Sequence, residues 1–400
     1  MNKSISNRER FKAIARGQRP GDVMIIDWFH RCLVETPSVW VEQGAPPEIL
    51  DGSTFSGARI DAMSEYFGYD CLYALREIVS GMHRLDLFSK TDAESFYPTP
   101  PIVPVFEIKV LEEDERTRVE TTFGGQIVRV SKKYPWRMPT YLDHPVKDRA
   151  TWNKYKWRLD PNVPERWPSD WDAFVEKRNS EDTPVCLLAG GFFGPLRSMM
   201  GLEQLLYLFY DDPILVEDMM DTMLYLETEV IKRVLKSMKI EMVRFWEDMA
   251  YKTGPMISPK MFGKFILPRY KKLCDLFHSY GIDLIHVDSD GNIEKLIPLW
   301  LEVGVNFNWP LEVTAGMDAV ALRKEYGKHL ILAGNIDKRV FTKGKSTIRD
   351  EVMSKVPYLL ETGGYFPSLD HNIPPDVPFE SFKYYINLLR EIGGYEKLPE

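Results

Sequence analysis

The sequence predicts an α/β protein built as a (β/α)8 barrel, with an N-terminal helical extension and a β-hairpin elaboration. From residue 184 onward, short β-rich runs alternate with helical segments. The connections between them are short, which implies parallel strands joined by right-handed crossovers. Nearly every strand ends on a polar or charged residue, as barrel strands do where their loops build a site. A doubly wound open sheet is the alternative, because alternation alone does not distinguish a closed sheet from an open one.

The first predicted element is a short helix at the N-terminus. Ser6 followed by Glu9 forms a capping box, and Phe11 and Ile14 fall on one helical face. Gly17 is placed to end this helix.

The next 170 residues contain fewer regular patterns. Val23–Asp27 is typical of a buried strand that ends on a carboxylate, and Thr36-Pro37 begins another helix. Residues 80–180 are rich in proline and tryptophan, and Arg118–Val130, around Gly124-Gly125, indicates a β-hairpin. We interpret this stretch as an irregular elaboration on one barrel domain that spans residues 1–400.

Six strands and their flanking helices follow in regular order. The predicted strands are Pro184–Ala189, Met242–Asp248, Ile282–Asp288, Val305–Trp309, Leu330–Asp337 and Gly364–Leu369. Helices open at Asp212-Pro213, Ser258-Pro259 and Pro378, and they close at Gly281, Gly304, Gly327 and Gly393. Pro268 is expected to kink one of them. With Val23–Asp27 and one strand in the 70–110 region, these runs make the eight strands of a barrel.

Composition narrows the class of function. Lys+Arg 51 against Asp+Glu 59 gives a net charge of −8, which disfavours binding to nucleic acid or to an anionic membrane. The four cysteines are far apart and form no CxxC pair, and the N-terminal residues contain no apolar signal core. We therefore expect a protein of the reducing cytoplasm.

Candidate site residues lie at the strand ends, where a barrel carries its function. Strand alternation places His286 and Asp288 on one face and Ile285 on the other, so the first two should point into the lumen. Asn335 and Asp337 share a face in the same way. Two histidines, His286 and His371, with carboxylates nearby suit a divalent metal of the zinc type.

Each of these residues also has a purely structural interpretation. Carboxylates at strand ends often cap the next helix, as Asp290 before Gly291-Asn292 partly suggests and as Asp212 does before Pro213. A buried histidine such as His286 can simply be a hydrogen-bonded core residue. Other chemistries leave no trace, because no phosphate-binding loop, dinucleotide fingerprint or nucleophile elbow is present.

A series of motifs resembles the uroporphyrinogen decarboxylase superfamily. The motifs are Asp288-Ser289-Asp290-Gly291-Asn292, Pro310-Leu311-Glu312, Ala315-Gly316-Met317-Asp318, Gly334-Asn335-Ile336-Asp337, Gly363-Gly364-Tyr365 and Asp370-His371-Asn372-Ile373-Pro374-Pro375, with Arg8-Glu9-Arg10-Phe11 and Arg19-Pro20 near the start. The resemblance covers nearly the whole chain and implies a (β/α)8 barrel. The superfamily contains porphyrinogen decarboxylases and corrinoid-linked methyltransferases.

Two departures from the family patterns narrow the reaction: one disfavours porphyrinogen decarboxylation, and the other disfavours a thiol as methyl acceptor. Decarboxylases resemble one another in an arginine-rich segment after the first strand, where this chain has Asp27-Trp28-Phe29-His30-Arg31-Cys32. Members that methylate thiols carry zinc on a His-x-Cys pair, where this chain has His286-Val287-Asp288. A site of oxygen and nitrogen ligands activates a thiol poorly, so a thiol acceptor is disfavoured. The chain also lacks the Asp-x-His-x-x-Gly corrinoid motif, so a partner protein would supply the corrinoid.

The resemblance therefore implies a corrinoid-dependent methyltransferase that demethylates a small methoxy or methylamine compound. Assigned roles are catalytic for Asp288, Glu247 and His371, substrate-binding for Asp27, Trp28, His286, Asn335, Asp337 and Glu312, and metal-binding, with zinc, for His286, Asp288 and His371. Relatives are often dimers, which implies a homodimer. The alternatives are a cofactor-free decarboxylase that uses Asp27 or Asp288, and a barrel that binds a ligand without catalysis.

Overall fold

The structure is a computed structural model of the chain. It describes residues 5–399 except 27, 29–31, 34, 52–61, 71, 76–100, 136 and 168. The predicted site residue Asp27 therefore lies outside the described residues.

A parallel sheet forms the centre of the molecule and has the strand order β1-β6-β7-β10-β11-β12-β13. Its strands are β1 (Tyr73–Leu75), β6 (Val185–Leu188), β7 (Met242–Trp246), β10 (Ile285–Asp288), β11 (Phe307–Trp309), β12 (Ile331–Ile336) and β13 (Tyr365–Leu369). All six strands predicted after residue 184 are present. The segment that ends at Ile26 precedes them and forms a parallel bridge with Asp70, just before β1. The eight segments thus follow the order of a (β/α)8 barrel.

One apolar cluster fills the interior of this barrel. It contains residues within, or directly before, each of the eight segments, and its members include Met24, Leu72, Cys186, Met242, Leu284, Phe307, Ile331 and Phe366. Trp28 packs edge-on against both Phe307 and Phe366, with ring centroids 5.2 and 5.3 Å apart. Residues that alternate with these along the strands belong to a separate, larger cluster under the helices. Side chains therefore form two layers, one on each side of the barrel wall.

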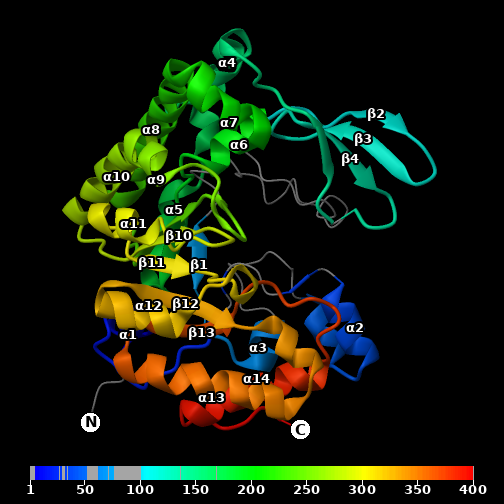
Figure 1. Cartoon of the computed structure of the whole chain (residues 1–400), viewed down its shortest axis with the longest axis vertical. Coiled ribbons are helices and arrows are strands. Elements are labelled where there is room, and N and C mark those ends of the chain that lie inside the picture. Colours follow the sequence, from blue (N-terminus) through cyan, green and yellow to red (C-terminus); the bar gives the residue numbers. More distant parts are fainter. Residues whose placement is uncertain are drawn as a thin grey trace.

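The helices surround the wall, as Figure 1 shows. They are α1 (Asn7–Ala15), α2 (Thr36–Glu42), α3 (Ala62–Phe67), α6 (Gly194–Met200), α7 (Leu202–Asp211), α8 (Pro213–Leu235), α9 (Pro259–Met261), α10 (Leu267–Ser279), α11 (Ile297–Val303), α12 (Ala319–Tyr326), α13 (Lys345–Thr362) and α14 (Phe379–Ile392). Asp212 and Ser258 cap α8 and α9 as predicted. Pro268 lies in the first turn of α10, within an unbroken helical segment that runs from α9 through a π-helical turn at Phe262–Ile266.

Helix α1 closes the amino-terminal end of the barrel. Ser6 accepts a hydrogen bond from the Glu9 backbone N–H, so the predicted cap is present. Phe11 packs against Phe366 in the interior with ring centroids 5.3 Å apart. The other end of the barrel, where the strands terminate, remains available for a site.

The predicted elaboration contains a second, antiparallel sheet. Its strands are β2 (Val110–Glu113), β3 (Thr117–Thr121), β4 (Ile127–Ser131) and β5 (Thr140–Asp143), followed by α4 (Arg149–Tyr155) and α5 (Trp171–Ser180). The predicted hairpin is the β3–β4 pair, in which Thr121 pairs with Ile127. Figure 1 shows β2, β3 and β4 standing out from the barrel beside α6 and α7. Within the described part of the chain, no helix is both long enough and apolar enough to cross a membrane.

Truncating Phe366 should destabilise the barrel, because this fully buried ring contacts α1, Trp28 and Phe307. We expect Phe366→Ala to lower the free energy of unfolding in urea by about 3–5 kcal/mol. Tyr210→Ala is the control, since that ring is 75% exposed and its loss should change little. Equal losses for the two variants would contradict the interior packing described above.

Candidate active site

Three carboxylates meet at the carboxyl-terminal mouth of the barrel. Asp288 is the last residue of β10, Asp290 lies two residues beyond it, and Asp248 lies just after the neighbouring strand β7. One oxygen from each carboxylate lies within 4.8 Å of the others. We call these three residues the acidic triad. Adjacent parallel strands bring them together because both strands end at the same rim.

Each member of the acidic triad contacts a cationic side chain. Arg244, from β7, forms a buried ion pair with Asp288. Arg197, from α6, lies 3.5 Å from Asp248 Oδ2, and His371 Nε2 lies 3.4 Å from Asp290 Oδ2. Three like charges at this separation repel one another strongly in a partly dry site. The three cations reduce that repulsion.

The environment separates the proton affinities of the triad. Burial raises the pKa of Asp248 to about 7, and the charges of Asp290 and Asp288 add to the effect. The pKa of Asp288 is also raised by burial, although Arg244 opposes the shift. Burial acts in the same direction on Asp290, but its hydrogen bond with His371 and the positive charges of His371, Lys338 and Arg197 together outweigh burial and lower the pKa of Asp290. Near neutral pH the site therefore combines one carboxyl group that is partly protonated, Asp248, with one that has lost its proton, Asp290.

His371 is the cationic partner of Asp290. Burial lowers the pKa of its imidazole, but the hydrogen bond and the charge of Asp290 outweigh burial, so the net shift is upward. Its ring stacks on Trp309 at a centroid distance of 6.1 Å and an interplanar angle of 18°. His371 and Asp290 therefore form an oriented pair in which the imidazole tends to hold a proton.

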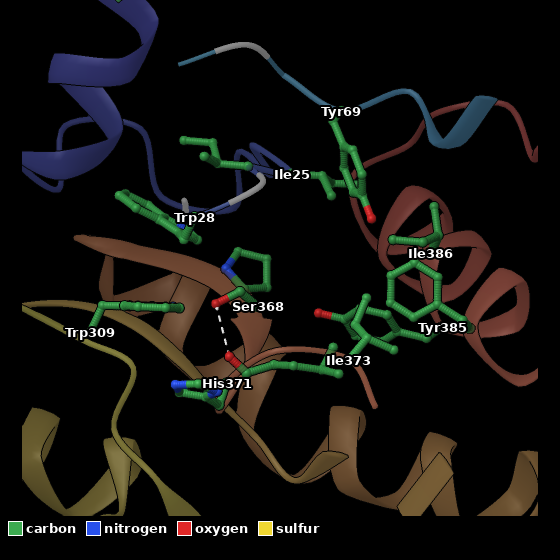
Figure 2. Close-up of a pocket in the computed structure, with 13 residues that line it drawn as sticks. Ile25, Trp28, Tyr69, Trp309, Ser368, His371, Ile373, Tyr385 and Ile386 are labelled. Carbon is green, nitrogen blue, oxygen red and sulfur yellow. Dashed lines mark hydrogen bonds between the residues drawn. The ribbon is translucent and has the colours of Figure 1, made fainter. Parts of the chain in front are cut away.

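A pocket opens beside His371. Figure 2 shows Trp28 and Trp309 facing this space, with Ser368 and His371 next to them. The remaining lining residues are Ile25, Ile26, Tyr69, Pro367, Leu369, Ile373, Phe382, Tyr385 and Ile386. The walls are therefore mainly aromatic and aliphatic, and His371 is the ionisable side chain that connects the pocket with the acidic triad.

Glu247 does not face this pocket. Its carboxylate is fully buried and accepts hydrogen bonds from the backbone N–H groups of Phe192, Phe193 and Gly194 and from the Tyr270 hydroxyl. These four donors occupy both oxygens. Glu247 thus fastens the start of α6, which carries Arg197, and it has no free oxygen for the catalytic role that we predicted.

Three predicted substrate-binding residues instead support the loops of the mouth. Asn335 donates to the carbonyls of Leu311 and Met317 and accepts from the Ala319 N–H. Asp337 accepts from the Arg339 backbone and pairs with the Arg339 guanidinium. Glu312 accepts from the Gly291 N–H, close to the acidic triad. Asn335 and Asp337 thus have their polar side-chain atoms engaged with protein, and Glu312 is engaged through Oε2.

The predicted metal set of His286, Asp288 and His371 is not brought together. His286 is fully buried in the lumen, stacked on Trp28 and edge-on to Phe307. Strand alternation correctly placed it on the same face as Asp288, but two residues lower along β10. Among the described residues, the group of carboxylates, imidazoles and thiols close enough to share one ion is the acidic triad. Its ligands are all oxygens, and no described cysteine belongs to it.

The sequence interpretation overlooked two arginines. Arg244 lies between the buried residues Val243 and Phe245 on β7 and is itself buried. Arg244 lies two residues after Met242 and therefore on the same face of β7. Because Met242 belongs to the interior cluster, strand alternation could have placed the Arg244 side chain in the lumen. Arg197 had no such signal, because its helix begins after an irregular turn.

Comparison with known proteins places the chain among enzymes. A family model described as "Uroporphyrinogen decarboxylase (URO-D)" matches residues 136–392. Proteins named uroporphyrinogen decarboxylase from Syntrophotalea carbinolica and Helicobacter pylori are each 24% identical, over 140 and 189 residues. These matches cover 35% and 42% of this chain and 39% and 50% of the relatives, so the chain spans less than two thirds of their length.

One similar solved structure is a methyltransferase from Methanosarcina mazei. It superimposes with a TM-score of 0.55 at 15% identity, and the alignment covers 97% of this chain and 99% of the other. At this identity, the likeness extends to the fold alone.

Replacing Asp290 with asparagine should lower the pKa of His371, because the asparagine keeps the shape but removes the negative charge. NMR titration of the His371 ring protons would measure the shift. Asp337→Asn is the matched control, since Asp337 pairs with Arg339. An unchanged His371 pKa in Asp290→Asn would contradict the pairing.

Glu247→Gln should weaken the attachment of α6 at the mouth of the barrel while keeping the size of the side chain. Glutamine cannot accept all four hydrogen bonds, so we expect a loss of about 2–4 kcal/mol in stability and a change in the proton affinity of Asp248 through Arg197. Urea denaturation and carboxyl NMR would test both effects. Wild-type values in this variant would show that the start of α6 does not depend on Glu247.

Proposed function

The chain belongs to the uroporphyrinogen decarboxylase family, and we propose that within this family it is a corrinoid-dependent methyltransferase. Its substrate would be a small methoxy or methylamine compound, and a separate corrinoid protein would accept the methyl group. The observation that carries the proposal is the position of His371, which borders an aromatic pocket while bonded to Asp290. That arrangement suits proton donation to a leaving group.

The walls of the pocket support a methylated substrate. Trp28 and Trp309 offer flat apolar faces that contact methyl groups well, and indole faces also attract methylammonium cations. The acidic triad beside His371 disfavours a substrate that carries several carboxylates, because like charges would be brought together. A neutral or cationic methylated compound meets both conditions.

With an uncharged substrate, the reaction requires a proton at the departing heteroatom; a methylammonium ion already carries that proton. The bond between the methyl carbon and oxygen or nitrogen breaks, its electron pair stays on the heteroatom, and His371 gives that atom a proton. A reduced corrinoid carried by the partner protein would supply the electron pair for the new bond to the methyl carbon. Asp290 holds the imidazole in position and stabilises its protonated form. Asp248, whose pKa burial raises to about 7, is partly protonated near neutral pH and can supply a replacement proton within the acidic triad.

The proposal does not depend on zinc. A thiolate-rich zinc site does not fit the described residues, because the donor set at the mouth is all oxygen and each carboxylate already has a cationic partner. If a divalent cation binds, we expect it at the acidic triad, where carboxylate oxygens suit a hard ion such as Mg²⁺ or Mn²⁺.

Cofactor-free decarboxylation is the second candidate. It is favoured by the sequence similarity to proteins named uroporphyrinogen decarboxylase. In that reaction Asp288 would stabilise a developing cationic ring. Buried Arg244 already neutralises Asp288, which weakens this role.

His371→Gln should lower the rate of methyl transfer by about 10²–10⁴-fold, the usual range for losing a general acid. The assay follows methylation of free cob(I)alamin with methoxybenzene or trimethylamine as donor. His329→Gln, at an exposed position, is the matched control. Release of CO2 from a porphyrinogen, without methyl transfer, would favour the second candidate.

The pH profile provides an independent test. Because the acid form of His371 is the active one, activity should be present below its raised pKa and should fall as the pH rises through it. Asp290→Asn lowers that pKa, so the alkaline limb of kcat/KM should move to lower pH. A limb that stays in place would exclude His371 as the acid.

Elemental analysis of wild type and Asp288→Ala would show whether the acidic triad binds an ion.

A further inference from the structure

Two buried carboxyl groups bind the turn that begins α6. Glu247 accepts hydrogen bonds from the backbone N–H groups of residues 192–194. Glu227, from α8, accepts from the Gly191 N–H through Oε1 at 3.0 Å. Both glutamates are fully buried. We call residues 190–194 the α6 turn, and these two side chains fasten it from the side of the barrel wall that faces the helices.

The Glu227 carboxyl group lies directly against the backbone of the α6 turn. A Cβ at Gly190 would lie 2.5 Å from Glu227 Oε1, so a side chain at this position would collide with the carboxyl group. The same Cβ would lie 3.4 Å from the end of Met223, one turn earlier on α8. Glu227 and Met223 are both fully buried, so the carboxyl group is shielded from solvent.

The two carboxyl groups differ in their number of hydrogen-bond donors. Three N–H groups and the Tyr270 hydroxyl occupy both oxygens of Glu247, whereas Glu227 Oε2 has no hydrogen-bond partner. Among the described residues, the titratable groups that face Glu227 are Glu247, just after β7, and Tyr270, from α10; neither can be a cation. A charge on an oxygen without donors, beside a second carboxylate, is strongly destabilised in a dry site. A proton on Glu227 removes that charge.

We propose that Glu227 is a neutral carboxylic acid in the folded protein and that loss of its proton loosens the α6 turn. The charged form would place two carboxylates on one short turn. Because α6 carries Arg197, which donates to the Asp248 carbonyl, a loosened turn would release a cation from the acidic triad. This inference goes beyond the proposed function, since it holds for any reaction at the mouth.

The response is to alkaline pH. Burial raises the pKa of Glu227 from 4.5 to about 8, and the charge of Glu247 adds to the effect. The folded protein therefore binds this proton more tightly than the unfolded chain does. Its contribution to stability is complete below about pH 4.5 and is lost as the pH rises to about 8. Above that range the Glu227 carboxyl group is charged in the folded protein, and the α6 turn opens.

Glu227→Gln tests the protonation state, because glutamine keeps the size and the acceptor for the Gly191 N–H but cannot ionise. Urea denaturation of the full chain measures stability from about pH 5 to about pH 9. Relative to this variant, the unfolding equilibrium constant of wild type should rise by up to about tenfold for each pH unit between about 5 and 8. Glu229→Gln is the matched control: Glu229 lies on the same helix, is partly exposed and pairs with Lys232, so its variant should follow wild type.

Hydrogen exchange tests the loosening of the α6 turn. Wild type and Glu227→Gln are compared at the same pH, which removes the intrinsic pH dependence of exchange. At about pH 6, amides of the α6 turn and of α6 should exchange equally in the two proteins. Above about pH 8, they should exchange at least about tenfold faster in wild type, while amides of α14 should not differ.

Each outcome supports or overturns one part of the proposal. Equal pH dependence of unfolding in wild type and Glu227→Gln overturns the neutral acid. Equal exchange of α6 in both proteins at alkaline pH overturns the loosening. Neither measurement involves methyl transfer, so failure of the proposed function leaves both results interpretable.

Two further variants keep the proposal testable if Glu227→Gln does not fold. Glu227→Met, an apolar side chain of similar length, should lose the same pH dependence. Infrared spectra of Asp248→Asn, which removes a second carboxyl group that titrates near neutral pH, should contain a protonated carboxyl band that disappears near pH 8. A spectrum in which no such band is lost would overturn the neutral acid.

Discussion

Repulsion among three carboxylates is the constraint on which the mouth of the barrel depends. Asp248, Asp288 and Asp290 converge because two adjacent strands end at one rim. Such a group is tolerated only when protons or cations balance it. The buried pair of Arg244 with Asp288 provides part of that balance, and His371 provides another part. The balance raises the pKa of both Asp248 and His371, which is the basis of the proposed chemistry.

The fold maintains this balance from outside the pocket. Glu247 follows β7 directly and holds three backbone N–H groups at the start of α6. That helix carries Arg197, which donates to the backbone carbonyl of Asp248. Gly191, in the same turn, has a φ of +113°, and a Cβ there would lie 2.7 Å from the Trp246 carbonyl. A buried carboxylate and a glycine turn thus position an arginine that the substrate need never touch.

Much of this fold could be predicted from local patterns, but the roles within the site could not. Alternation along β10 correctly oriented His286 and Asp288, and caps such as Asp212 marked the helices. Alternation does not give depth along the barrel axis, so His286 was wrongly grouped with His371 at one metal. Alternation also does not show whether a polar side chain is fully hydrogen-bonded within the protein. Glu247 and Asn335 are, so they hold loops and helix starts in place. Arg197 was missed because its partner is distant in sequence.

The position of His371 relates the charge balance to substrate choice. Its ring contacts Trp309 on the pocket side while its Nε2 meets Asp290, so substrate and carboxylates act on the same imidazole. An anionic substrate would compete with Asp290 for that proton and would face the rest of the acidic triad. An apolar molecule avoids this competition and gains contact with aromatic walls. Charge and wall chemistry at His371 therefore act in the same direction, and both favour uncharged methylated compounds over polyanions.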